Sequence, residues 1–446
     1  MSSKRNLAIG NIAALFTVKL QSPNREAGVP AGSAIAESNR WMRLAKNVLL
    51  VLTLAGIVYY FAHGFEEREK GTDFPDFYAA ARMVREGYGH QLYDFEAQEK
   101  FQIRYAGRTG DYYIHPPFET LLFLPLSLWS LQTAYLLWCL LNAAVLAYTA
   151  IVFQRHVFKR LEWRVLLPLF FLFPPVLLSF LQGQDSLLLL LIMTLAVVEL
   201  KRDRNFKAGC LLGCGLIKFH IILTLVVLVA SLRRKGLLRG FALVFVILLL
   251  TSAGISGWTF LTIYPRFLMR LSSMPLAGIH PAAMANIRGL VNISGIAQDT
   301  TVRLALIGIG SVLLFWYAWG SFKRVKSEFA GDTNLAFGNF LLAAMLVSYH
   351  LSPPDLCIAL PPMGLFSQYL AEHTGIPRWA RLGLLGSQCV LLLPPLHVIS
   401  LSRHVYVYPI IPILIMFLLT SAKTFRGIPR HVDGSAIVSR FPPIAR

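Results

Sequence analysis

Residues 207–232 of the chain read KAGCLLGCGLIKFHIILTLVVLVASL, and after the first residue the only full charge in this stretch is Lys218. A transmembrane helix needs roughly 20 mostly apolar residues, because the hydrocarbon core of a bilayer is about 30 Å thick. The stretch is therefore long enough to enter a membrane. Basic clusters flank it on both sides, at 201–204 and 233–239. Because basic connections tend to stay in the cytoplasm, the pattern predicts a broken helix that enters and returns, with Lys218 near the bend.

Apolar segments of similar character recur along the rest of the chain. Hydrophobic residues make up 55% of the 446 residues and charged residues 15%, whereas a soluble domain carries about 25% charged residues. The composition predicts an all-α polytopic membrane protein with about 9–11 transmembrane helices. The short segment 118–131, which contains Pro125, is either a second re-entrant segment or a short span. The other predicted apolar segments lie at about 41–62, 132–154, 165–181, 185–200, 239–258, 303–322, 334–351, 356–371, 383–399 and 407–421.

The net charge of +19 comes from Lys and Arg residues that cluster in short connections between the apolar segments. Such clusters are typical of cytoplasmic loops and bind anionic lipid head groups. Nucleic-acid binding would explain the sign of the charge but not the hydropathy, so we expect anionic membrane lipids as partners and no nucleic acid. The five cysteines lie within or beside apolar runs and show no metal-ligand spacing. The sequence also contains no motif of the zinc proteases, the P-loop proteins or the serine hydrolases.

The segment pattern predicts one transmembrane domain, 41–425, between two cytoplasmic tails at 1–40 and 426–446. Basic residues before the first span place the start of that span in the cytoplasm. Two longer polar stretches, 63–117 and 259–302, then become extracytoplasmic loops. The sequence shows no internal repeat of the kind found in many transporters.

The first loop contains a predicted amphipathic helix from Asp73 to Glu86, with apolar residues at helical spacing. Such a helix can lie flat on a membrane surface. Asp73 and Asp76 are three residues apart and therefore lie on one face of the helix. A carboxylate at a membrane surface is a suitable general base for an acceptor hydroxyl. Alternatively, the two residues only cap the helix and stabilise its first turn.

Several basic side chains are candidates for binding phosphate. Lys218 lies deep in an apolar segment, where an ionisable residue is costly and marks function, unless its amine reaches the membrane surface. Arg288 in the second loop is suited to holding phosphate oxygens in a two-pronged geometry, or it is a surface charge. His350 can donate to phosphate or shuttle protons. Asp355 either orients that histidine or caps the next helix.

Two short motifs carry amide side chains. Gln182 and Gln184 belong to Gln182-Gly183-Gln184-Asp185, which separates two apolar segments. Their amides are suited to binding sugar hydroxyls, and the alternative is a polar turn with Asp185 as a helix cap. Asn286 lies in Asn286-Ile287-Arg288-Gly289 in the second loop.

These residues together resemble a known family. The run Gly71-Thr72-Asp73-Phe74, followed by Phe77-Tyr78-Ala79-Ala80, is similar to the first-loop motif of the bacterial polyprenol-phosphate-mannose-dependent mannosyltransferase-like family. That family belongs to the GT-C superfamily of membrane glycosyltransferases. The resemblance covers roughly residues 41–360. Further matches in chain order are Leu92-Tyr93-Asp94, Tyr113 to Pro117 with Pro125, Gln182-Gly183-Gln184, Ala208-Gly209 through Gly215 to Lys218, Asn286 to Leu290, and Asp355-Leu356.

The sequence departs from the family pattern at two places. Phe219-His220 follows Lys218, where the family often has proline. Pro353-Pro354 precedes Asp355, where the family often has aromatic residues. These departures leave the reaction class better supported than the identity of the donor sugar.

The resemblance implies a GT-C-type helical bundle in the plasma (inner) membrane, with a cavity that opens to the outer leaflet. It implies an acidic base in the first loop, a role that falls by position on Asp73, with Asp76 as the alternative. It also implies a polyprenyl-phosphate donor, commonly of mannose, an extracytoplasmic lipid or glycan acceptor, and inversion at the anomeric carbon. Residues expected to contact the sugar or the acceptor are Gln182, Gln184, Asn286, His115, Tyr113 and Asp355.

The same chemistry assigns a role to the basic residues. Lys218, Arg288 and His350 are expected to hold the departing phosphate, whose charge grows as the bond to the sugar breaks. No cofactor is expected, and the residue inventory leaves the use of a divalent metal open. A pair of catalytic carboxylates, as in glycoside hydrolysis, is not required, because the lipid phosphate is already a good leaving group.

Two other functions would use similar residues. A flippase or transporter of lipid-linked sugars would need the same cavity and cations but no carboxylate in the first loop. A polysaccharide polymerase or ligase would favour paired arginines in an outer loop, and Arg266 and Arg270 fit that pattern. The expected function is a membrane glycosyltransferase, with these two as alternatives.

Overall fold

The computed structural model describes residues 73–107, 109, 111–231, 233–273, 281–296, 299–322, 330–373, 375–402 and 405–422, with a few more between 43 and 55. The chain divides into two compact units, Met1–Val48 and Leu49–Arg446, and the second unit contains every element named below. Gly71, Thr72, both predicted tails and most of the predicted first span lie outside the described residues.

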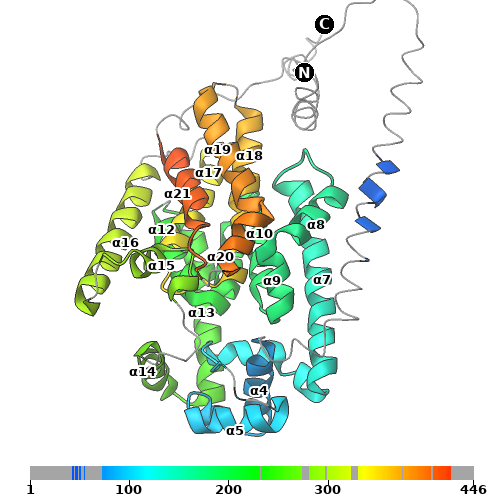
Figure 1. Cartoon of the computed structure of the whole chain (residues 1–446), viewed down its shortest axis with the longest axis vertical. Helices are drawn as coiled ribbons and strands as arrows, with labels where there is room; N and C mark the ends of the chain where they lie inside the picture. Colours follow the sequence, from blue (N-terminus) through cyan, green and yellow to red (C-terminus); the bar gives the residue numbers. More distant parts are fainter. Residues whose placement is uncertain are drawn as a thin grey trace, which may run out of the picture. The chain divides into compact units, whose positions relative to one another are not determined.

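The described part of the second unit consists of helices joined by loops, and no strand occurs among its residues. Figure 1 shows α4 and α5 at the lower end of the view, with α18 and α19 toward the upper end. The first loop and its exit form α4 (Phe74–Arg85), η2 (Gly89–Gln91), α5 (Phe95–Ala106), η3 (Pro117–Glu119), α6 (Thr120–Phe123) and η4 (Leu126–Leu128). The second loop forms α14 (Phe260–Ser273), η6 (Pro281–Ala283) and α15 (Ile287–Ile293). The bundle contains α7 (Leu131–His156), α8 (Trp163–Leu172), α9 (Pro174–Gln182), α10 (Ser186–Lys201), α11 (Asn205–Cys214), η5 (Gly215–Lys218), α12 (Phe219–Ala230), α13 (Lys235–Ser256), α16 (Thr300–Phe322), α17 (Ala330–Val347), η7 (Pro353–Ala359), α18 (Leu360–Glu372), α19 (Arg378–Leu392), α20 (Pro394–Ser402) and α21 (Ile410–Ser421).

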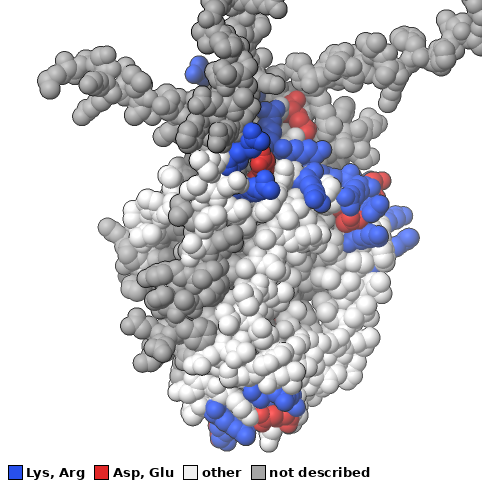
Figure 2. Space-filling view, turned by 90° about the vertical axis from the view of Figure 1, so that its right-hand side faces the viewer, with Lys and Arg blue, Asp and Glu red and all other residues white. Residues whose placement is uncertain are grey.

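Four described helices are long and apolar enough to cross a membrane: α7, the combined segment Asn205–Ala230, α13 and most of α16. Two bent helix pairs raise the number to six, and α17 and α21 contribute shorter apolar helices. On the face drawn in Figure 2, the charged residues gather near two ends and leave an uncharged band between them. The prediction of an all-α polytopic membrane protein is confirmed. The predicted total of about 9–11 spans stays a prediction.

Residues 207–232 do not enter and return, which corrects the expectation from the sequence. They belong to one apolar helix, Asn205–Ala230, in which the short 3-10 helix η5 joins α11 to α12. A 3-10 turn is tighter than an α-helical turn but keeps the direction of the chain, so it interrupts the helix without reversing it. Lys218 is the last residue of η5 and therefore lies near the middle of the span.

Sharp bends occur instead at paired prolines. α8 and α9 meet at 69° beside Pro174-Pro175, and α19 meets the following helix at 53° beside Pro394-Pro395. Proline lacks an amide hydrogen and restricts the residue before it, so a helix usually ends at that residue. Each bent pair is either one broken span or a re-entrant segment. The segment 118–131, for which both paths were considered, is divided among η3, α6 and η4 before α7 begins.

Helix α4 is the predicted amphipathic helix of the first loop, and most of its residues are buried within the protein. Its buried residues include Phe74, Phe77, Tyr78 and the run Ala79–Ala81, which together occupy more than one side of the helix. The Phe77 ring stacks on Phe123, with the ring centroids 4.6 Å apart. Aromatic residues of the loop therefore enclose α4 in a core of its own, and α14 adds Phe260 and Phe267 to that core.

Glycines allow α11 and α13 to pack with their backbones in close contact. A Cβ atom on Gly209 would lie 1.9 Å from the carbonyl oxygen of Leu237, and one on Gly240 would lie 2.1 Å from that of Phe206. Small residues at such positions are the usual way in which transmembrane helices approach closely. This packing fixes the helix that carries Lys218 against its neighbour.

We expect Gly240→Val to destabilise the protein by about 1–3 kcal/mol or more, because the new side chain meets a backbone carbonyl that no rotamer change can move. Thermal unfolding in detergent micelles measures the effect. Gly254→Val is the matched control on the same helix, since a Cβ atom at Gly254 meets nothing within 4 Å. Equal melting temperatures for the two variants would contradict the close packing.

Candidate functional site

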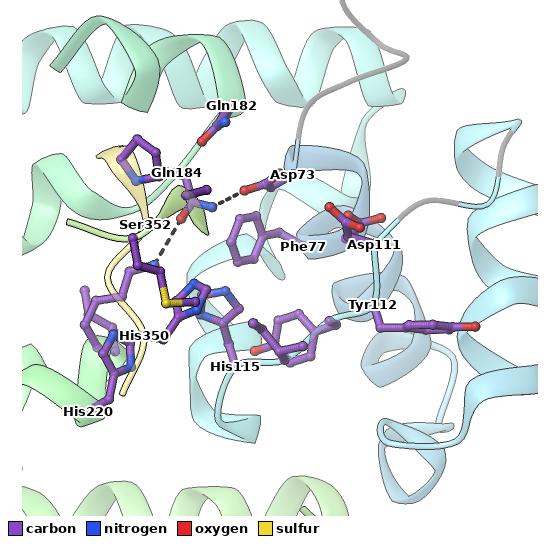
Figure 3. Close-up of a pocket in the computed structure, with 18 of the residues that line it drawn as sticks. Asp73, Phe77, Asp111, Tyr112, His115, Gln182, Gln184, His220, His350 and Ser352 are labelled. Carbon is purple, nitrogen blue, oxygen red and sulfur yellow. Dashed lines mark hydrogen bonds between the residues drawn. The ribbon is translucent and has the colours of Figure 1, made fainter. Parts of the chain in front are cut away.

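The described residues enclose a cavity of about 430 Å³ between the first loop and the bundle. Its walls come from the start of α4, the loop after α5, the turn between α9 and α10, the junction of η5 with α12, and the loop before η7. Figure 3 shows Asp73 and Asp111 on one side of the cavity and His220 and His350 on the other. Eight predicted site residues line the cavity: Asp73, Asp76, Tyr113, His115, Gln182, Gln184, Lys218 and His350.

The turn Gln182–Asp185 holds the start of α4 against the bundle. The amide of Asp73 donates to the carbonyl of Gln182 at 3.1 Å, and the indole of Trp138 donates to the carbonyl of Gly183 at 2.8 Å. Gly183 has φ +65°, and a Cβ atom there would lie 2.6 Å from Cβ of Phe74. Only glycine adopts this backbone conformation without cost and leaves room for the first loop. The motif Gln182–Asp185, which was predicted to be either a sugar site or a polar turn, therefore forms a turn that contacts the first loop.

Asp73 precedes α4, but its side chain makes no capping hydrogen bond to the described first turn of that helix. Its carboxylate instead accepts a short hydrogen bond from the amide nitrogen of Gln184. Asp76, one turn later, is 6% exposed and accepts from Gln102 at 3.0 Å. The geometry thus favours a role in the cavity for Asp73 over the alternative of a helix cap.

Lys218 is buried among carboxylates and does not reach a membrane surface. Its Nζ lies 3.0 Å from Oδ1 of Asp185 and 3.6 Å from Oδ1 of Asp355, and it donates to Oε1 of Gln184 at 3.0 Å. The Lys218 side chain is 3% exposed and both carboxylates are 0% exposed. A buried ammonium group is tolerated when opposite charges and hydrogen bonds compensate for the lost water. The positive charge of Lys218 is therefore already balanced within the protein.

Asp355 does not line the cavity, and it performs the capping role that was one of its two predicted alternatives. Its Oδ2 accepts from the backbone amide of Ser352 at 3.1 Å and from the hydroxyl of Ser352 at 2.7 Å, in a capping box at the start of η7. Its Oδ1 accepts from the Ser186 hydroxyl at 2.7 Å. These bonds fix the carboxylate that faces Lys218.

Arg288 and Asn286 lie behind the cavity wall. The guanidinium of Arg288 stacks on the Tyr349 ring at 4.1 Å and donates to the Tyr349 carbonyl at 3.1 Å. Asn286 is fully buried, donates to the Ser348 carbonyl at 2.8 Å and caps α15 through the amide of Gly289. Arg288 therefore ties the second loop to Tyr349, which does line the cavity, and Asn286 ties it to the preceding residue, Ser348.

Two histidines on the cavity wall face each other. The rings of His220 and His350 are perpendicular, with their centroids 5.7 Å apart. Nε2 of His220 and Nδ1 of His350 are buried, and neither has a hydrogen-bond partner among the residues that the structure describes. Buried polar atoms are normally satisfied, so a pair of unsatisfied imidazole nitrogens at a cavity points to a ligand.

The loop after α5 supplies neutral polar groups. Burial lowers the pKa of His115 well below its ordinary value, and the charge of Lys218 lowers it further, so this imidazole is neutral near pH 7. Nδ1 of His115 lies 3.0 Å from a carboxyl oxygen of Glu119. Burial also raises the pKa of Tyr113 well above its ordinary value, and its hydroxyl donates to the Pro116 carbonyl at 2.8 Å.

Reasoning from the sequence assigned no separate role to His220, Asp111 or Glu119, and it missed the ion pair of Asp185 with Lys218. His220 and Glu119 lie in apolar segments, where an ionisable residue is itself a signal of function. Asp185 was considered only as a helix cap, because the sequence does not show which residues meet Lys218. Among the described residues, no group of three His, Cys, Asp or Glu side chains is arranged to hold a metal ion.

We expect Lys218→Met to lower the free energy of unfolding by about 3–5 kcal/mol, because it leaves two buried carboxylates without their cation. The double variant Lys218→Met/Asp185→Asn should recover part of that loss, since it removes one of the two charges. Melting in detergent measures both, with Lys207→Met as the control at an exposed lysine of α11. A double variant no more stable than Lys218→Met alone would contradict the coupling.

Comparison with known proteins agrees with the membrane fold and the cavity. The sequence model of Glycosyltransferase family 87 matches residues 113–353, which is more than half of the 446-residue chain. The matched region begins in the loop after α5 and ends at the start of η7, so it includes the cavity residues of the bundle except Leu401, but not Asp73 or Asp76. No curated protein matches the chain, and no solved structure does. The chain belongs to glycosyltransferase family 87, a GT-C-like family of membrane glycosyltransferases.

Proposed function

We propose that this membrane glycosyltransferase moves a hexosyl residue, namely mannosyl, from a polyprenyl phosphate to an extracytoplasmic lipid or glycan acceptor. The observation that carries the proposal is the arrangement of the cavity, where the carboxylate of Asp73 faces across to two unsatisfied imidazoles. The carboxylate is suited to accept the proton of an acceptor hydroxyl. The imidazoles are suited to donate hydrogen bonds to a leaving phosphate.

The reaction is a single displacement. The acceptor oxygen attacks the anomeric carbon, and the bond from that carbon to the phosphate oxygen breaks with its electron pair going to the phosphate. Asp73 takes the proton of the acceptor hydroxyl, with Asp76 as the alternative base. Because the oxygen attacks from the side opposite the leaving group, the configuration at the anomeric carbon inverts.

The phosphate gains negative charge as it leaves, and fixed donors that meet this charge lower the barrier. His350 and His220 provide imidazole nitrogens at the cavity, and Arg288 adds a positive charge behind Tyr349. Lys218 is less suited to this task than the sequence suggested, because Asp185 and Asp355 already balance its charge. The predicted roles of Gln182, His115 and Tyr113 in sugar or acceptor binding remain proposals.

The apolar part of the cavity supports a lipid-linked donor. Ile217, Phe219, Leu268, Met284 and Leu401 line it alongside the polar residues. A polyprenyl chain needs such a surface next to its phosphate, because its isoprene units avoid water. The basic residues of the bundle connections support a plasma-membrane topology in which the first loop and the cavity lie outside the cytoplasm.

The competing functions find less support in the cavity. Arg266 and Arg270 of α14, the arginine pair that a polymerase or ligase would favour, are not among the described residues that line it. A flippase would not require a carboxylate in the first loop, so the presence of Asp73 in the cavity lining supports the transferase over the flippase.

We expect Asp73→Asn to lower the rate of sugar transfer by about 10²–10⁴-fold, because the amide cannot accept the hydroxyl proton. Purified protein is given radiolabelled polyprenyl-phosphate mannose and a native membrane-lipid extract, and labelled product is measured together with its anomeric configuration. Asp76→Asn tests the alternative base, and Glu96→Gln, at an exposed carboxylate of α5, is the control. Equal transfer by wild type and Asp73→Asn would exclude Asp73 as the base, and a wild type that transfers from no lipid-phosphate sugar would exclude the donor class.

We expect His220→Phe to lower the transfer rate by about 10²-fold, because phenylalanine keeps the ring but removes a donor to the leaving phosphate. The variant should also bind polyprenyl phosphate more weakly. His90→Phe, at an exposed histidine of the first loop, is the control. Unchanged affinity for polyprenyl phosphate in His220→Phe would place the phosphate elsewhere.

A further inference from the structure

We propose that Gln184 is a positioning residue, whose side-chain amide connects Lys218 to Asp73 and holds the Asp73 carboxylate in its working orientation. This inference rests on the proposed function, because it assumes that Asp73 is the base. It gives Gln184 a role other than the sugar contact expected from the sequence. It also gives Lys218 a task that does not require contact with the donor phosphate.

The contacts form a continuous chain across the cavity wall. Nζ of Lys218 donates to Oε1 of Gln184 at 3.0 Å, and Nε2 of Gln184 donates to Oδ2 of Asp73. Figure 3 shows the side chain of Gln184 beside Asp73, with a dashed line for the hydrogen bond between them. Gln184 is 5% exposed, so water competes little for its amide.

The direction of this chain follows from the chemistry of its ends. An ammonium group has only donors and an ionised carboxylate only acceptors. A neutral side chain that touches both must therefore accept at one end and donate at the other, as a primary amide does. The amide oxygen faces Lys218 and the amide nitrogen faces Asp73, and a flipped amide would place like groups together at both ends.

Both ends of the chain are fixed. Lys218 is held by Asp185, the residue next to Gln184 in sequence, and by Asp355, which Ser186 and Ser352 hold in turn. At the other end, the backbone of Asp73 is attached to the same turn through the carbonyl of Gln182. One turn thus binds both the backbone amide and the side chain of Asp73, and so orients the carboxylate.

Two consequences follow for the base. A hydrogen bond to a carboxylate favours its charged form, and a nearby positive charge acts in the same direction. Asp73 should therefore stay ionised to a lower pH than it would without Gln184. The Asp73 carboxylate should also sample fewer orientations, since a fixed donor holds one of its oxygens.

Other titratable groups surround the cavity, and they would remain unchanged when only Gln184 is replaced. A difference between two proteins that differ at residue 184 alone therefore reports the contribution of the amide. The titratable groups around the cavity, other than Asp73, that stay the same in this comparison are Asp76, Asp111, His115, Glu119, Asp185, Lys218, His220, His350 and Asp355.

The test measures the protonation of Asp73 directly. A hydrophobic carbodiimide, which modifies protonated carboxyl groups, is applied to the full-length protein in detergent at a series of pH values, and mass spectrometry gives the modified fraction of Asp73. Wild type is compared with Gln184→Leu and with Gln184→Glu, which keeps the size of the side chain. Gln182→Leu is the matched control, because Gln182 accepts the hydrogen bond from Asp73 through its backbone carbonyl.

We expect the midpoint of Asp73 modification to rise by about one pH unit in both Gln184 variants and to stay unchanged in Gln182→Leu. The apparent pKa of the acidic limb of the pH–rate profile for sugar transfer should increase by the same amount. The affinity for the donor should stay within about twofold of the wild-type value. Equal midpoints in wild type and both Gln184 variants would overturn the inference. If the midpoint rises in both Gln184 variants but the wild type transfers no sugar, the positioning role is supported and the proposed function is refuted.

Discussion

The burial of one ammonium group is the constraint on which the rest of the site depends. Lys218 lies at the middle of a long apolar helix, where an uncompensated charge would be very costly. Asp185 and Asp355 balance the charge, and they come from the starts of α10 and η7. Three segments that are distant in the sequence must therefore meet at one point. The cavity forms beside this point, because the same segments carry Gln184, His220 and the loop before η7.

The first loop reaches the bundle through a second contact of a different kind. The turn between α9 and α10 offers a carbonyl and an amide to Asp73, and Gly183 leaves room for Phe74. Aromatic residues of both outer loops, together with Trp138 of α7, pack around α4 beside the bundle. The site is thus assembled from two parts, a loop that supplies carboxylates and a bundle that supplies imidazoles and an apolar surface. This division suits a reaction between a membrane-bound donor and an acceptor at the membrane surface.

Backbone chemistry decides the paths of the helices in ways that hydropathy does not show. The segment with basic residues at both ends was expected to turn back, yet it continues through a 3-10 turn. The bends occur at Pro174-Pro175 and Pro394-Pro395, where amide donors are missing. Proline pairs were the better signal for a change of direction, because a missing donor acts locally, whereas the charge rule concerns only the side on which loops come to lie.

The sequence by itself determined the membrane character, the helical class and most of the polar residues at the cavity. These properties are local, since an apolar segment of sufficient length enters a membrane and an ionisable residue within it is costly wherever it occurs. Only the tertiary structure decided which residues are partners. Gln184 and Asp73 are 111 residues apart, and Asp355 and Ser186 are 169 apart, so no spacing rule connects them. The tertiary structure also placed Arg288 and Asn286 behind the wall and brought His220 to it, because packing, not composition, determines which side of a helix faces the cavity.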